Sequence, residues 1–122
     1  MTNTLAIMLA ALSTLESGNN DQAKGIAGER GRHQITPAAW RETTSLPFSD
    51  ATNTAIETQI VLERIRKVTQ RDPASLTPAE FAKAWHFPFG NHLNRERRDY
   101  VRRFENVVAA EMSCNIKRNP IF

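Results

Sequence analysis

Two glutamates, separated by a polar segment rich in glycine, are the residues best suited to acid–base chemistry. Glu16 ends an apolar run, and Glu29 lies in the following segment, where Gly25, Gly28 and Gly31 recur every three residues. A glutamate beside apolar surface loses hydration, so its pKa rises and it can stay protonated near neutral pH. We therefore predict that Glu16 is a general acid; the alternative is an ordinary helix-end glutamate that reaches water.

Polar and aromatic side chains elsewhere could bind a ligand beside such an acid. Gln34 can hydrogen-bond a sugar hydroxyl or acetamide, or it can cap the helix that begins after Thr36. Trp85, His86 and Phe87 could wall a sugar-binding cleft, although most aromatic side chains in a domain of this size belong to the core. Both interpretations remain open for these residues.

The histidines and the single cysteine do not form a metal-binding pattern. The spacing of His33, His86 and His92 suits no compact site, and Cys114 alone permits neither an internal disulfide nor a cysteine cluster. We therefore expect neither a metal nor another cofactor.

Four short motifs follow one another along most of the chain. They are Glu16-Ser17-Gly18, the run GERGRHQITP over 28–37, the run AWHFPFG over 84–90, and Tyr100-Val101. In this order they resemble the motifs of the lysozyme-like lytic transglycosylases, which read E-S, G-A-x-G-L-x-Q-x-x-P, A-x-Y-N-A-G-x-G and Y-V. Asn53 also resembles the asparagine at the start of that family's long helix.

The resemblance implies a cell-wall glycosidase of the lysozyme-like superfamily. It implies that Glu16 protonates the oxygen of the bond between the two amino sugars of peptidoglycan. It also implies a set of substrate-binding residues: Ser17, His33, Gln34, Trp85 and His86. Such a protein acts in the periplasm or outside the cell, or it belongs to a phage.

Departures from the family pattern affect the expected chemistry. Arg32-His33 replaces an apolar pair and Trp85-His86 replaces tyrosine-asparagine, both where sugar would bind. Glu29 replaces a small residue and resembles the second carboxylate of animal-type lysozymes. A transglycosylase needs one acid/base, whereas a hydrolase usually needs two carboxylates. Glu29 is therefore a second catalytic candidate, unless it is an exposed residue paired with a neighbouring arginine.

Apolar periodicity and helix-capping residues predict the elements that position these residues. We expect helices over five ranges: 3–16, from Pro37 to no further than Ser45, 51–71, 78–85 and 92–113. Ser49 or Asp50 would cap the longest internal helix, and Thr77 begins a capping box. The prediction is a mainly α, lysozyme-like α+β fold of one domain over 1–122, with a small glycine-rich β-hairpin and a substrate cleft between hairpin and helices.

The same periodicity assigns faces to the two long helices. On the helix over 51–71 we expect an apolar stripe inside and four charged residues outside: Glu57, Glu63, Arg64 and Lys67. On the last helix, Tyr100 and Met112 are both expected to face inward.

Composition and charge narrow the class of partner. The 122 residues are 40% hydrophobic and 24% charged, which is typical of a folded globular domain. No run is long enough to span a membrane. The net charge of +3 favours an anionic partner, such as nucleic acid, an acidic membrane surface or cell-wall polymer. The arginine-rich run over 95–103 contains interleaved acidic residues. Pairing of the arginines with these acids makes a nucleic-acid-binding surface less favoured.

Three functions therefore remain open. The first is a peptidoglycan-cleaving glycosidase, acting as a lytic transglycosylase (a lyase) or as a lysozyme (a hydrolase), and monomeric. The second is a lysozyme-like module that binds the cell wall without turnover. The third is a basic helical domain that binds nucleic acid.

Overall fold

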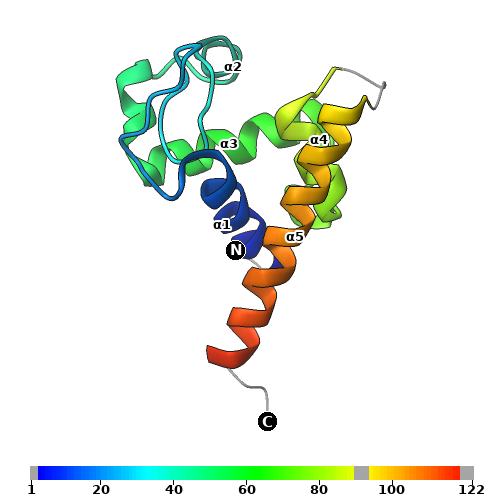
Figure 1. Cartoon of the computed structure of the whole chain (residues 1–122). Helices are drawn as coiled ribbons and strands as arrows, with labels where there is room; N and C mark the ends of the chain where they lie inside the picture. Colours follow the sequence, from blue (N-terminus) through cyan, green and yellow to red (C-terminus); the bar gives the residue numbers. More distant parts are fainter. Residues whose placement is uncertain (1–2, 90–93, 119–122) are drawn as a thin grey trace.

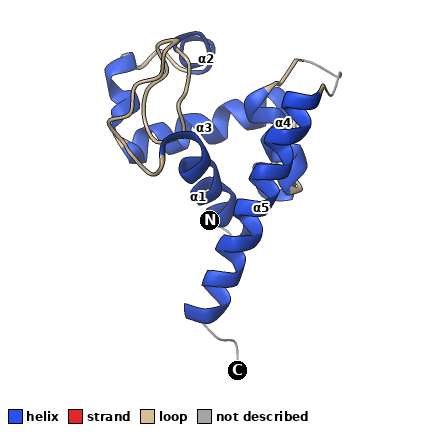
Figure 2. Cartoon of the chain, in the orientation of Figure 1, coloured by secondary structure: helices blue, strands red, loops and turns tan. Residues whose placement is uncertain are grey.

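The computed structural model describes residues 3–89 and 94–118 of the chain (Figure 1). Five α-helices lie within these residues: α1 (Asn3–Ser17), α2 (Pro37–Thr43), α3 (Thr54–Thr69), α4 (Pro78–His86) and α5 (Arg95–Arg118). Two short 3-10 helices, η1 (Phe48–Thr52) and η2 (Pro73–Ser75), flank α3. The expectation of a mainly helical fold is confirmed for the described part of the chain (Figure 2).

Capping side chains determine where two of the helices begin. Thr36 precedes Pro37 and accepts a hydrogen bond from the backbone N–H of Ala39 at 3.1 Å. Thr77 and Glu80 form the complete capping box at the start of α4, so each satisfies a backbone N–H that the helix leaves free. Both predicted starts are confirmed.

The start of α3 differs from the prediction. Residues 48–52 form the separate 3-10 helix η1, and the α-helix begins only after Asn53. The Asn53 side chain accepts from the backbone N–H of Ile56 at 3.2 Å and therefore caps the helix in place of Ser49 or Asp50. At the other end, Gln70 adopts a left-handed conformation, so α3 stops before Asp72.

The glycine-rich segment between α1 and α2 consists of turns and loops (Figure 1). In place of regular strands it has two isolated antiparallel bridges, Lys24 with Arg30 and Arg30 with Ile35. The chain therefore folds back on itself twice within a few residues. Tight turns at this spacing leave no length for a ladder of strand hydrogen bonds.

Two hydrophobic clusters pack on either side of α3. The larger joins α1, α3, α4 and α5, with Phe81 and Phe104 stacked at 5.8 Å between ring centroids. The smaller cluster lies between α2 and α3 and contains Ile35, Trp40 and Ile60. Trp85 of α4 packs against both clusters, so it lies where the helical part meets the glycine-rich part.

Three predicted side-chain orientations are wrong. Glu57 is completely buried and Arg64 nearly so, because each finds polar partners in segments that pack against α3. Met112 is 41% exposed and does not belong to either hydrophobic cluster.

Some predictions concern residues outside the described part of the chain. These are Gly90 and His92; the last helix, expected from residue 92, begins at Arg95. Among the described residues, Asn94 accepts from the backbone N–H of Arg97 at 2.9 Å and so caps the first turn of α5. No helix in the described ranges has both the length and the apolar character needed to cross a membrane.

Candidate active site

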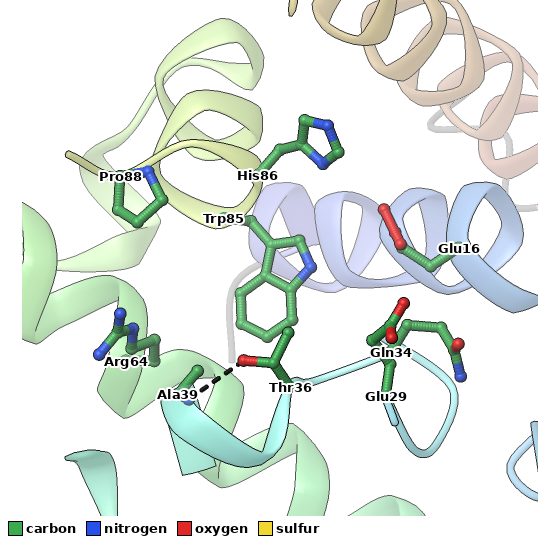
Figure 3. Close-up of a pocket in the computed structure, with 9 residues that line it drawn as sticks. All are labelled: Glu16, Glu29, Gln34, Thr36, Ala39, Arg64, Trp85, His86 and Pro88. Carbon is green, nitrogen blue, oxygen red and sulfur yellow. Dashed lines mark hydrogen bonds between the residues drawn. The ribbon is translucent and has the colours of Figure 1, made fainter. Parts of the chain in front are cut away.

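A pocket of about 310 Å³ lies where α1, the glycine-rich segment, α2, α3 and α4 approach one another (Figure 3). Nine of the described residues line it: Glu16, Glu29, Gln34, Thr36, Ala39, Arg64, Trp85, His86 and Pro88. Five of these are predicted site residues, namely Glu16, Glu29, Gln34, Trp85 and His86. Its volume falls within the range of small-molecule sites.

Glu16 occupies the last turn of α1, and its carboxyl group lies at the pocket wall. Burial raises the pKa of Glu16 above its ordinary value, and the negative charge of Glu29 raises it further. A hydrogen bond from Tyr100 and the nearby charges of Arg103 and His33 oppose the rise without cancelling it. A carboxyl group in this environment holds its proton at higher pH than an exposed glutamate.

Tyr100 of α5 holds the Glu16 carboxyl group in place. Its hydroxyl donates to Oε1 of Glu16 at 2.7 Å, and its ring stacks on His86 with centroids 3.8 Å apart. Burial, followed by the charge and hydrogen bonding of Glu16, raises the pKa of Tyr100 well above its usual range. The phenol therefore keeps its proton near neutral pH and remains a hydrogen-bond donor.

His86 ends α4 and faces the same pocket. Partial burial of its imidazole lowers the pKa of His86, and the positive charges of Arg103 and Arg97 lower it further. The ring is therefore neutral near pH 7. Together with Trp85 it forms the wall opposite the glycine-rich segment (Figure 3).

Glu29 points into the pocket from the glycine-rich segment (Figure 3). A Cβ atom added to Gly25 would lie 2.5 Å from Oε2 of Glu29, so the glycine makes room for the carboxylate. Oε1 of Glu29 is buried and has no hydrogen-bond partner among the described residues. Arg30 donates to the backbone carbonyls of Gly28 and Glu29, not to this carboxylate.

Gln34 stabilises the glycine-rich segment by side-chain hydrogen bonds to its backbone. Its side-chain amide donates to the carbonyls of Ala23 at 3.2 Å and Gly31 at 2.9 Å. These bonds occupy the amide nitrogen, while Thr36 alone caps α2. Gln34 therefore lines the pocket and also fixes the loop that carries Glu29.

Ser17 and His33, predicted to bind substrate, are not among the residues that line the pocket. The Ser17 hydroxyl donates to the backbone carbonyl of Arg32 at 2.6 Å, which ties α1 to the loop. His33 is buried, and both its backbone N–H and its Nδ1 contact the carboxylate of Glu57 on α3. Both side chains therefore support the loop and do not line the pocket.

Sequence reasoning missed three residues of this arrangement. The sequence predicts Tyr100 only as part of a motif and as an inward-facing residue, whereas in the structure it hydrogen-bonds to Glu16. Arg64 lines the pocket and Glu57 holds the loop, although both were expected at the surface. Their spacing on α3 offered a signal, because positions 57 and 64 are seven apart and share a helix face with Ile60 and Val61.

No group of histidine, cysteine or carboxylate side chains that could hold a metal ion occurs among the described residues. No protein family matches the chain, and comparisons with curated proteins and with solved structures give no significant match.

Proposed function

We propose that this protein cleaves the β-1,4 bond between N-acetylmuramic acid and N-acetylglucosamine in peptidoglycan, with Glu16 as general acid and base. The observation that carries the proposal is the Glu16 carboxyl group, which has a raised pKa and is held by Tyr100 beside a second carboxylate in one pocket. The motif resemblance of the sequence to lysozyme-like lytic transglycosylases supports the same assignment.

In the first step, Glu16 donates its proton to the glycosidic oxygen as the bond to the anomeric carbon breaks. The leaving sugar departs with a free hydroxyl group, and positive charge develops on the remaining sugar ring. Glu16, now ionised, then removes a proton from the nucleophile that attacks the anomeric carbon. The Tyr100 hydrogen bond stabilises this ionised form.

The nucleophile is either water or a hydroxyl group of the substrate itself. Attack by water makes a reducing end, and attack by the internal hydroxyl makes an anhydro sugar. We favour water, because Glu29 lines the same pocket and leaves a buried carboxylate oxygen without a partner among the described residues. A second carboxylate can orient water or stabilise the developing positive charge.

The pocket walls would hold the sugar. Trp85 and His86 offer ring faces on which a sugar could stack, and Gln34 fixes the loop on the other side. Such a reaction takes place at the cell wall, in the periplasm or outside the cell.

Digestion of purified sacculi by Glu16→Gln tests the proposal. The variant should fold normally and lose cell-wall clearing by about 100-fold or more, because the amide cannot donate the proton. Glu63→Gln, which changes an exposed glutamate on α3, is the matched control and should retain full activity. Retained clearing by Glu16→Gln would refute the assignment, as would wild-type protein that binds sacculi but releases no fragments.

Mass spectrometry of the released fragments separates the two chemistries. Reducing ends would support the hydrolase, and anhydro ends would support the transglycosylase. If Glu29→Ala leaves both the rate and the products unchanged, Glu29 is not the second catalytic carboxylate.

A further inference from the structure

Among the described residues that line the pocket, one side chain is positively charged. Arg64 of α3 lines it, although only 9% of its side chain is exposed. Figure 3 places Arg64 and Pro88 on one side of the Trp85 indole, with Glu16, Glu29 and Gln34 on the other. A ligand that filled the pocket would meet carboxyl groups at one end and a guanidinium at the other.

The structure fixes Arg64 but uses only part of its hydrogen-bonding capacity. Nη1 donates to Oε2 of Glu42 at 2.6 Å, and the guanidinium lies over the ring of Phe89, 5.5 Å from its centroid. Nε and Nη2 form no hydrogen bond with any residue in the described ranges. Guanidinium has five N–H donors, so several remain for a ligand.

The ion pair with Glu42 helps to hold Arg64 in this position, but it engages only one nitrogen of the guanidinium. The Glu42 side chain is 55% exposed, so water weakens the pair. Burying a guanidinium beside a pocket costs free energy unless its charge is used. An anionic ligand group would complete its hydrogen bonds, and a planar carboxylate matches the guanidinium with two parallel bonds.

We propose that Arg64 forms an anionic subsite that binds a carboxylate on the sugar bound in the pocket. The inference rests on the proposed function, because it names which amino sugar the pocket accepts. N-acetylglucosamine is neutral. Muramic acid carries a lactyl ether whose carboxyl group is either free or joined to a peptide that bears its own carboxylates. Arg64 would therefore make the protein select muramic acid polymers over neutral chitin-like polymers.

Binding to three ligands in a Glu16→Gln background tests this without any turnover. The ligands are a chitin oligosaccharide, a muramic acid-containing oligosaccharide without peptide, and the same oligosaccharide with peptide. Isothermal titration calorimetry should show about 10-fold tighter binding of at least one anionic ligand than of the neutral one, as one charge-assisted contact permits. Preference for the peptide-free ligand identifies the lactyl carboxylate as the partner, and preference for the peptide-bearing ligand alone identifies the peptide.

Adding Arg64→Gln should abolish the preference and leave the affinity for the neutral oligosaccharide unchanged. Arg66→Gln makes the same charge change at an exposed position of α3 and should leave the preference intact. If Arg64→Gln does not fold, Arg64→Lys replaces it; the lysine keeps the charge but loses the paired geometry, so an intermediate preference is expected. An equal loss for all ligands, or an unchanged preference, would overturn the subsite.

The outcomes also separate this inference from the proposed function. Wild-type protein that cleaves no sacculi, but shows an Arg64-dependent preference, would leave the subsite standing and refute the glycosidase. Wild-type protein that cleaves sacculi without any Arg64-dependent preference would support the glycosidase and refute the subsite.

Discussion

The hydroxyl of Tyr100 donates a 2.7 Å hydrogen bond to Oε1 of Glu16, joining two residues that are 84 positions apart in the sequence. The contact exists because α5 packs along α1, which brings the second turn of α5 to the last turn of α1 (Figure 1). Tyr100 is itself fixed by its stack on His86. The orientation of the proposed catalytic carboxyl group therefore depends on packing among α1, α4 and α5.

Replacing Tyr100 by phenylalanine should change the pH dependence of the proposed reaction. The hydrogen bond from Tyr100 lowers the pKa of Glu16, so its loss should raise that pKa further. Since a general acid works only when protonated, the alkaline limb of the pH–rate profile should move to higher pH. The maximal rate should fall about 10-fold, because one hydrogen bond to an ionised group is lost in the second step.

Phenylalanine keeps the ring that stacks on His86, so the fold should be retained. Circular dichroism and a loss of about 1 kcal/mol in the free energy of unfolding would confirm this. An alkaline limb that does not move would show that the Tyr100 hydroxyl has no influence on the acid.

Glu16→Gln should make the protein more stable at neutral pH. Burial raises the pKa of Glu16 in the folded state above the unfolded value of 4.5, so folding favours the protonated carboxyl group. The contribution of the protonated carboxyl group to the free energy of unfolding is fully present below the unfolded pKa. It is lost as pH rises through the folded pKa. Glutamine stays neutral throughout and can still accept from Tyr100.

Urea denaturation of both proteins at about pH 7 and about pH 3.5 measures this difference. The variant should have the higher free energy of unfolding at neutral pH, and the two values should converge in acid. Equal stability at both pH values would contradict the burial of the carboxyl group.

Glu29→Gln should lower the pKa of Glu16. The negative charge of Glu29 raises that pKa, and glutamine removes the charge while keeping nearly the same shape. Carbon-13 NMR titration of the Glu16 carboxyl group measures the change even if the variant is inactive. Glu63→Gln, on the exposed face of α3, should leave the titration unchanged. A Glu16 pKa that does not respond to Glu29→Gln would place the two carboxylates too far apart to cooperate.

Glu57→Ala should destabilise the protein by about 3 kcal/mol, because it leaves His33 buried without its partner. Glu57 is fully buried in the first turn of α3, and Nδ1 of His33 lies 2.8 Å from its Oε1. Glu63→Ala removes an exposed carboxylate from the same helix and should change the free energy of unfolding by no more than about 0.5 kcal/mol. Similar values for the two variants in urea denaturation would refute the role assigned to Glu57.

Local signals in the sequence predict most helix starts. Thr36 and Thr77 cap helices because each needs only residues within the next turn, and such short-range patterns are visible in one sequence. The position of Glu16 at the end of an apolar helix is equally local. The predicted start of α3 is wrong because Ser49 and Asp50, residue types that often cap a helix, lie inside the 3-10 turn over 48–52.

Long-range partners explain what sequence reasoning missed. Glu57 and Arg64 lie on the buried face of α3 because the partner of each, His33 or Glu42, comes from a segment more than 20 positions earlier in the chain. Binary patterning treats a charged residue as exposed unless a partner is known. The glycine-rich segment is held partly by side chains, since Gln34 and Ser17 both donate to its backbone carbonyls, and such contacts leave no periodic pattern in the sequence.

Gly31→Ala should be among the most damaging single substitutions in the chain. Gly31 has a φ angle of 85°, and a Cβ atom there would collide with the carboxylate of Glu57 and the backbone carbonyl of Ala51. Relief of the collision would require α3 and the loop to separate, which would break the contacts between His33 and Glu57. We expect a loss of about 3 kcal/mol or more, measured by urea denaturation.

Gly18 is the matched control: its φ angle is 63°, but a Cβ atom there meets nothing within 4 Å. Gly18→Ala should therefore lower the free energy of unfolding only by the backbone strain, about 1 kcal/mol. Equal losses for the two variants would show that backbone conformation, not the packing of the loop against Glu57, requires glycine at position 31.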